Sequence, residues 1–190
     1  MLDTLTVDSR PYRWPWHGRL DPRRTALVVC TGDLRAALPP APLERLAVAI
    51  GRCREAGVSI MWLPAAGTEP PPPLVMHGDL VSDRPCFGGF TGTALDLALR
   101  VAGRSDLLVA GAPFELGADC TMREANDLGY ECLLLEDCSA GLSAETFAGA
   151  VRSAQMSGGI FGAVAGSDAL LAALRLLARP ACSEKGTRDA

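Results

Sequence analysis

Short apolar runs alternate along the chain with segments whose apolar residues recur every three or four positions. Five runs rich in strand-forming residues are predicted to be strands: 26–30, 58–63, 107–110, 131–135 and 160–164. Continuous apolar runs of this length are typical of strands that are buried on both faces. Helical spacing follows at 43–56, 93–102, 115–128, 144–156 and 167–177. Repeated strand–helix units predict an α/β fold of three layers, in which helices cover both faces of an open, mainly parallel sheet.

This pattern runs through the chain without a linker long enough to separate two domains. A length of 190 residues is sufficient for one domain with a sizeable core. We therefore expect a single domain over residues 1–179 and a flexible polar tail over residues 180–190. Ligands of open α/β sheets bind beyond the carboxyl ends of the strands. The segments that follow the predicted strands, or approach the same edge, are 31–35, 64–73, 84–93, 111–120 and 136–142.

Composition and charge narrow the class of protein. Apolar residues make up 48% of the chain and charged residues 21%, as in an ordinary globular protein. A net charge of −4 argues against nucleic acid or an anionic membrane as a partner. No apolar run is long enough to span a bilayer, and residues 1–22 lack the apolar core of a signal peptide. The seven cysteines are then expected to be reduced thiols of a cytoplasmic protein.

Two segments of the C-terminal half are specific enough to indicate a family. Residues 120–138 (CTMREANDLGYECLLLEDC) and 158–174 (GGIFGAVAGSDALLAAL) closely resemble the isochorismatase-like cysteine hydrolases. Within that superfamily they look most like the biuret- and ureidoacrylate-type amidohydrolases. The resemblance extends to residues 12–21, 25–33 and 84–100, and so covers most of the chain. It implies a Rossmann-like fold, a small-molecule ligand and assembly as a homodimer or homotetramer.

The resemblance also implies an Asp–Lys–Cys catalytic triad, but all three matching positions hold other residues. Thr31 stands at the Asp position, Arg84 at the Lys position and Gly117 at the Cys position. Family members attack a carbonyl with a thiolate while the carboxylate moves the proton. Gly117 has no side chain, so thiol chemistry at this position is impossible. Arg84 retains a positive charge that can stabilise an anion, but an arginine cannot relay a proton.

Three residues near these positions are candidates for the missing roles. Asp33 is either a replacement general acid or base, or a cap for the segment that follows it. Thr31 is either a substrate ligand through its hydroxyl or an ordinary end of a strand. Cys120 lies about one helical turn beyond Gly117 and is either a displaced nucleophile or buried packing.

The segment before Gly117 supplies further candidates for the ligand site. Relatives have a cis peptide bond here, and we expect it at Ala112–Pro113 because proline tolerates the cis form best. Glu115 and Asp119 either suit a helix N-terminus or make the site acidic and suited to an amine-bearing ligand. Phe114, like Phe90 and Trp16 elsewhere in the chain, is either a wall of the ligand site or part of the core.

Neither a metal ion nor another cofactor is expected. The chain has two histidines, His17 and His77. Nicotinamidase-type relatives bind a metal ion after the second strand with one Asp and two His, but residues 63–73 contain no histidine.

Three functions from different classes remain open. The first is an enzyme that acts on a small molecule without a thiol, as isochorismatases proper do with Gly at this position. The second is a catalytically inactive protein that binds a small molecule or a protein partner. The third is a hydrolase that uses a displaced cysteine. The cation at Arg84, the carboxylate of Asp33 and Pro113 favour the first, with Asp33 as the proton donor.

Overall fold

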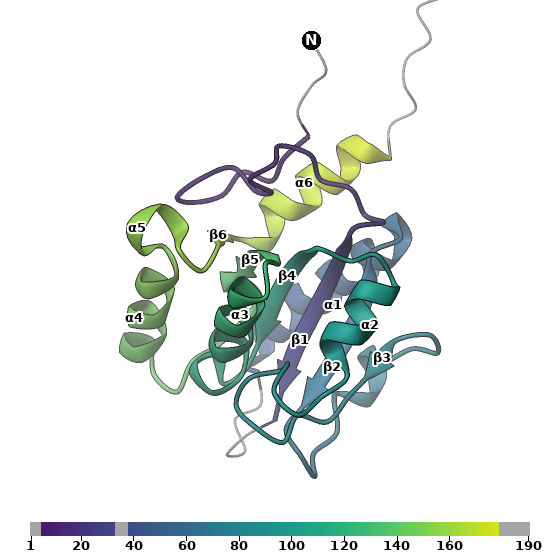
Figure 1. Ribbon diagram of the computed structural model, residues 1–190, viewed down its shortest axis with the longest axis vertical. Helices are drawn as coiled ribbons and strands as arrows, with labels where there is room; N and C mark the ends of the chain where they lie inside the picture. Colours follow the sequence, from purple (N-terminus) through teal and green to yellow (C-terminus); the bar gives the residue numbers. More distant parts are fainter. Residues whose placement is uncertain (1–4, 33–37, 179–190) are drawn as a thin grey trace, which may run out of the picture.

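The computed structural model describes residues 5–32 and 38–178, so Asp33 and the predicted tail over 180–190 lie outside the described residues. Within the described part, strands form one sheet in the order β3-β2-β1-β4-β5-β6 (Figure 1). Their bounds are Thr25–Thr31 (β1), Ser59–Pro64 (β2), Leu80–Val81 (β3), Asp106–Gly111 (β4), Glu131–Leu135 (β5) and Ala163–Ala165 (β6). Each neighbouring pair is parallel. The predicted α/β fold with an open parallel sheet is confirmed.

Helices cover both faces of this sheet, as Figure 1 shows. They are α1 (Pro40–Ala56), α2 (Leu95–Val101), α3 (Ala118–Asp127), α4 (Ala144–Ala154), the short α5 (Met156–Gly159) and α6 (Ser167–Leu177). Alternate residues of β1 point to opposite faces. Val29 packs in one core cluster with residues of α1 and α6, whereas Val28 and Cys30 pack in the other with residues of α2 and α3.

Three local differences from the predicted elements have simple causes. The helix expected over 115–128 begins at Ala118, because Phe114–Leu116 form a 3-10 turn and Gly117 has non-helical dihedral angles (φ −148°, ψ −79°). The last strand begins at Ala163, after Gly162 with φ 134°. Strand β3 was not expected, because two residues carry no periodic pattern; it pairs with Met61 and Trp62.

An N-terminal segment covers the free edge of the sheet next to β6. Arg10 and Val164 exchange backbone hydrogen bonds of 2.9 and 2.7 Å in an antiparallel bridge. Trp14 is completely buried in the core cluster shared with α1 and α6. Edge strands covered in this way are protected from pairing with other chains. Among the described helices, none combines the length and the apolar composition needed to cross a bilayer.

Candidate functional site

Thr31 and Arg84 lie on either side of the end of β2. The N–H of Ala65 donates to the carbonyl of Thr31 at 2.9 Å, and the N–H of Arg84 donates to the carbonyl of Pro64 at 2.9 Å. Ala65 and Arg84 form a parallel bridge that extends the sheet beyond β2. The backbone therefore places the ends of β1 and β2 next to Arg84, at the carboxyl edge where ligands of such sheets bind.

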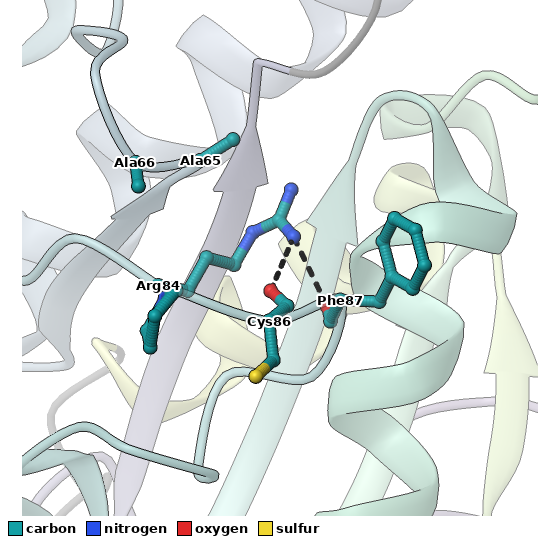
Figure 2. A pocket seen from close by; sticks show the side chains of 6 residues that line it. Ala65, Ala66, Arg84, Cys86 and Phe87 are labelled. Carbon is teal, nitrogen blue, oxygen red and sulfur yellow. Dashed lines mark hydrogen bonds between the residues drawn. The ribbon is translucent and has the colours of Figure 1, made fainter.

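The Arg84 side chain is buried, with 2% of the residue exposed, and reaches into the protein. Its Nε donates to the carbonyl of Leu63 at 3.2 Å. Its Nη1 donates to the carbonyls of Cys86, Phe87 and Leu116, each at 3.1 Å. The first two of these Nη1 bonds are drawn in Figure 2. Backbone carbonyls carry partial negative charge, so this arrangement stabilises a buried cation and fixes the plane of the guanidinium.

Arg84 also lies against Gly117, the N-cap of α3. A Cβ atom built on Gly117 would be 3.1 Å from Nη2 of Arg84 and 3.1 Å from Cβ of Cys30. The structure thus brings together two of the three positions that the resemblance assigns to the triad. It places Cys30, which the sequence did not single out, beside the same point.

A cavity of about 450 Å³ opens beside Arg84. Its lining residues come from the end of β2 and from the loop that follows Arg84: Ala65, Ala66, Arg84, Pro85, Cys86 and Phe87. Arg84 contributes the charge of this lining, and Phe87, a residue that is 55% exposed, contributes apolar surface. A site of this composition suits a small ligand that has both an anionic or polar group and an apolar part. Segments 64–73 and 84–93 were both expected at the site, but no pattern singled out Phe87 within them.

The turn before α3 contains a cis peptide bond at Ala112–Pro113, as expected. The N–H of Phe114 donates to the carbonyl of Ala140 at 2.8 Å, which ties this turn to the segment after β5. The N–H of Gly117 donates to the carbonyl of Phe114 at 3.3 Å. These two hydrogen bonds fix the conformation of the backbone between Pro113 and the start of α3.

Two of the three thiols near the site, those of Cys120 and Cys30, lie in surroundings that disfavour the reactive thiolate. Cys120 is half-buried, and its Sγ donates to the carbonyl of Glu115 at 3.4 Å. Burial, reinforced by the nearby Asp119 carboxylate, raises the pKa of Cys120. Burial raises the pKa of Cys30 to about 11. Cys86 is exposed at the cavity. A raised pKa keeps a thiol protonated at neutral pH and therefore unreactive.

The two predicted acidic residues are engaged by neighbouring groups. The Glu115 carboxylate accepts the N–H of Leu142, with the shorter contact at 3.0 Å. Asp119 accepts a hydrogen bond of 3.1 Å from Nε of Arg123, one turn further along α3. Neither residue is part of the cavity lining.

The remaining predicted residues lie in the core or lack a partner. Phe114 is completely buried and packs edge-to-face on Phe147, with ring centroids 5.4 Å apart. Phe90 is buried and packs against Tyr130, with ring centroids 5.4 Å apart. Thr31 is 8% exposed, and its Oγ1 is buried without a hydrogen-bond partner among the described residues.

Trp16, the third aromatic candidate, is 73% exposed and stacks edge-on with Tyr12 in the N-terminal segment, away from the cavity lining. No group of three His, Cys, Asp or Glu side chains in the described part of the chain is arranged to hold a metal ion.

Residues 50–168 match the Isochorismatase domain family, so the chain belongs to the isochorismatase family. Two relatives are the uncharacterized isochorismatase family proteins YwoC of Bacillus subtilis (strain 168), 33% identical over 78 residues, and YecD of Escherichia coli O157:H7, 36% identical over 59 residues. These alignments span 41% and 31% of this chain, and likewise only 41% and 31% of the two relatives.

Solved structures of the family have the same fold. An isochorismatase family protein from Burkholderia thailandensis superimposes with a TM-score of 0.69 and 24% identity, covering 82% of this chain and 97% of that one. A cysteine hydrolase from Pseudomonas syringae pv. phaseolicola 1448A superimposes with a TM-score of 0.71 and 18% identity, covering 90% of this chain and 97% of that one. At this level of identity, the likeness supports the fold alone.

Proposed function

We propose that this isochorismatase-family protein binds a small molecule in the cavity beside Arg84 and acts on it by hydrolysis or a related proton transfer, without a thiol nucleophile. The observation that carries the proposal is the contact between Arg84 and Gly117. The resemblance assigns the attacking side chain to position 117, and the guanidinium of Arg84 lies against that position instead.

In this proposal Arg84 and Asp33 have different tasks. Arg84 stabilises negative charge on the ligand or on the reacting group, because a guanidinium is a cation with several N–H donors in a fixed plane. Asp33, two residues beyond Thr31 at the end of β1, is the general acid or base. The raised pKa of Cys120 supports excluding that thiol as the nucleophile.

A second function is favoured by the way Arg84 is held. Four carbonyls accept hydrogen bonds from its Nε and Nη1 atoms, which is also the arrangement of an arginine that organises a loop. The second candidate is therefore an inactive member of the family that binds a small molecule or a protein partner.

Turnover of candidate substrates distinguishes the two. The purified protein is incubated with isochorismate, biuret, ureido acids and primary amides, and products are detected by mass spectrometry. Asp33→Ala and Arg84→Ala, which remove the carboxylate and the cation, are the test variants. Glu145→Gln, which changes an exposed carboxylate on α4, is the matched control.

The proposal predicts product from the wild type and from Glu145→Gln, and loss of product from the two test variants. Equal rates in all four proteins would overturn the assignment of Asp33 and Arg84. No product from any compound would favour the inactive, ligand-binding alternative.

We also propose that the protein works in a reducing, cytoplasmic compartment as a homo-oligomer. Six cysteines are free in the described part of the chain, which supports a reducing compartment. The exposed Leu97 and Val101 on α2 offer apolar surface for a second copy of the chain, which supports a homo-oligomer.

A further inference from the structure

The loop that lines the cavity with residues 84–87 is bound to α3, a few residues further along, by the carboxylate of Glu124. Glu124 lies on α3 and accepts three hydrogen bonds from the loop of residues 84–93. The donors are the N–H of Phe90 at 2.8 Å, the N–H of Thr91 at 3.4 Å and the hydroxyl of Thr91 at 2.5 Å. Hydrogen bonds to a charged acceptor are the stronger kind, so Glu124 anchors this part of the loop to α3.

The loop backbone approaches Glu124 so closely that a side chain at position 88 would have to displace the Glu124 carboxylate. A Cβ atom built on Gly88 would be 2.2 Å from Oε2 and 2.5 Å from Oε1 of Glu124. Gly88 has no unusual backbone dihedral angle that would itself require glycine. Steric contact with the carboxylate is therefore what restricts position 88, and a larger residue there would push Glu124 away from its donors.

The same short segment also holds Arg84. The carbonyls of Cys86 and Phe87 accept hydrogen bonds from Nη1 of Arg84, and these two residues immediately precede Gly88 (Figure 2). Residues 86–91 thus bind the guanidinium at one end and Glu124 at the other. If the Glu124 end is released, the carbonyls that fix the guanidinium lose their support.

We infer that Glu124 is a positioning residue: it holds residues 86–91 against α3, and so sets the orientation of Arg84 in the cavity. Glu124 acts through the loop and does not touch the cavity itself, since it is not among the lining residues. The consequence for turnover rests on the proposed function, but the orientation of Arg84 is measurable without any substrate.

The test uses NMR spectroscopy of the full chain. The Nε–H of Arg84, which donates to the carbonyl of Leu63, gives a resonance that reports on the guanidinium. It is assigned by its disappearance in Arg84→Lys. Amide hydrogen exchange at Phe90 and Thr91 reports on the loop. The variants are Glu124→Ala, Gly88→Ala and the two combined, and Asp127→Ala is the control. Asp127 is an exposed carboxylate on the same helix for which the described residues show no hydrogen bond.

We expect Glu124→Ala and Gly88→Ala each to speed exchange at Thr91 by about tenfold or more and to shift or broaden the Arg84 resonance. Asp127→Ala should change neither. The combined variant should be no worse than Glu124→Ala alone, because both changes break the same contact.

Faster exchange with an unchanged Arg84 resonance would overturn the inference and leave Glu124 as a loop anchor only. Fully additive effects in the combined variant would also contradict it. Where Glu124→Ala does not fold, Glu124→Gln keeps the shape of the side chain while removing its charge, and Gly88→Ala leaves the carboxylate intact; the same two readouts apply. None of these results depends on turnover, so a protein that proves inactive can still pass or fail this test.

Discussion

The guanidinium of Arg84 occupies the approach to position 117: its Nη2 lies 3.1 Å from where a Cβ of residue 117 would be. The Cβ of Cys30 borders the same point at the same distance. Both distances are shorter than ordinary van der Waals contact, so a side chain at 117 and the present orientation of Arg84 compete for the same space. The residue at 117 and the geometry of the cavity are therefore coupled.

Gly117→Ala should lower the free energy of unfolding by about 1–2 kcal/mol, because Arg84 and Cys30 must shift to admit one methyl group. Gly117→Cys should cost at least as much and should not create thiol hydrolase activity. Urea denaturation measures the first effect. Gly51→Ala is the control, because a Cβ there meets nothing within 4 Å, and alanine favours the helix α1 that contains it. If Gly117→Ala is as stable as the wild type, the contact does not restrict this position.

Arg84→Lys should destabilise the protein by about 1–3 kcal/mol, although it restores the residue type that the resemblance implies. An ammonium group cannot reproduce the planar fork that binds Leu63 on one side and Cys86, Phe87 and Leu116 on the other, so buried carbonyls lose donors. Thermal or urea unfolding measures the change.

The matched control is Arg52→Lys, because Arg52 is half-exposed and pairs with Glu55 on the surface of α1. Surface pairs of this kind contribute little, so its unfolding free energy should change by less than about 0.5 kcal/mol. Equal losses in the two variants would show that the carbonyls around Arg84 do not depend on its geometry.

The fold could be predicted from the sequence because its strands are continuous apolar runs that are buried on both faces. β1 and β4 are buried along their whole length, so the hydrophobic pattern and the structure carry the same information. The hydrophobic pattern did not predict the elements whose formation or bounds depend on tertiary contacts. The two residues of β3 form a strand only because β2 lies beside them, and the 3-10 turn at Phe114–Leu116 delays the start of α3.

Of the candidate site, only the positions that the family resemblance indicates could be predicted from the sequence. It indicated Arg84 and Gly117, which the structure brings into contact. Glu124 and Gly88 carried no signal, because an acidic residue on a helix and a glycine in a loop are ordinary in any sequence. Their relation appears only when the loop is folded against α3.

Alkaline pH should destabilise the protein through its buried thiols. Burial raises the pKa of Cys30 to about 11 and the pKa values of Cys53 and Cys138 to about 12, whereas thiols of an unfolded chain ionise near pH ~8.5. The stabilising effect of these protonated thiols is complete below pH ~8.5. It is lost as the pH rises toward the folded-state values, because the unfolded chain then binds fewer protons than the folded one.

Each such thiol should lower the free energy of unfolding by up to about 1.4 kcal/mol per pH unit in that range. Urea unfolding at a series of pH values from about 8 to 10.5 measures the slope. Cys53→Ala should reduce the slope, and replacement of the exposed Cys86 by Ser should leave it unchanged. A flat profile would contradict the burial of these thiols.

The turnover rate of a double variant, Cys86→Ser/Cys120→Ser, shows whether the site acts without a thiol. These cysteines are the exposed and the half-buried thiol of the described residues, and both lie near Arg84 or Gly117. With a substrate from the panel that the wild type converts, a reaction without a thiol nucleophile predicts a rate within about twofold of the wild type, because neither change removes a group that such a reaction uses. Loss of turnover in the double variant, with the protein still folded, would contradict it and identify a displaced cysteine as the nucleophile.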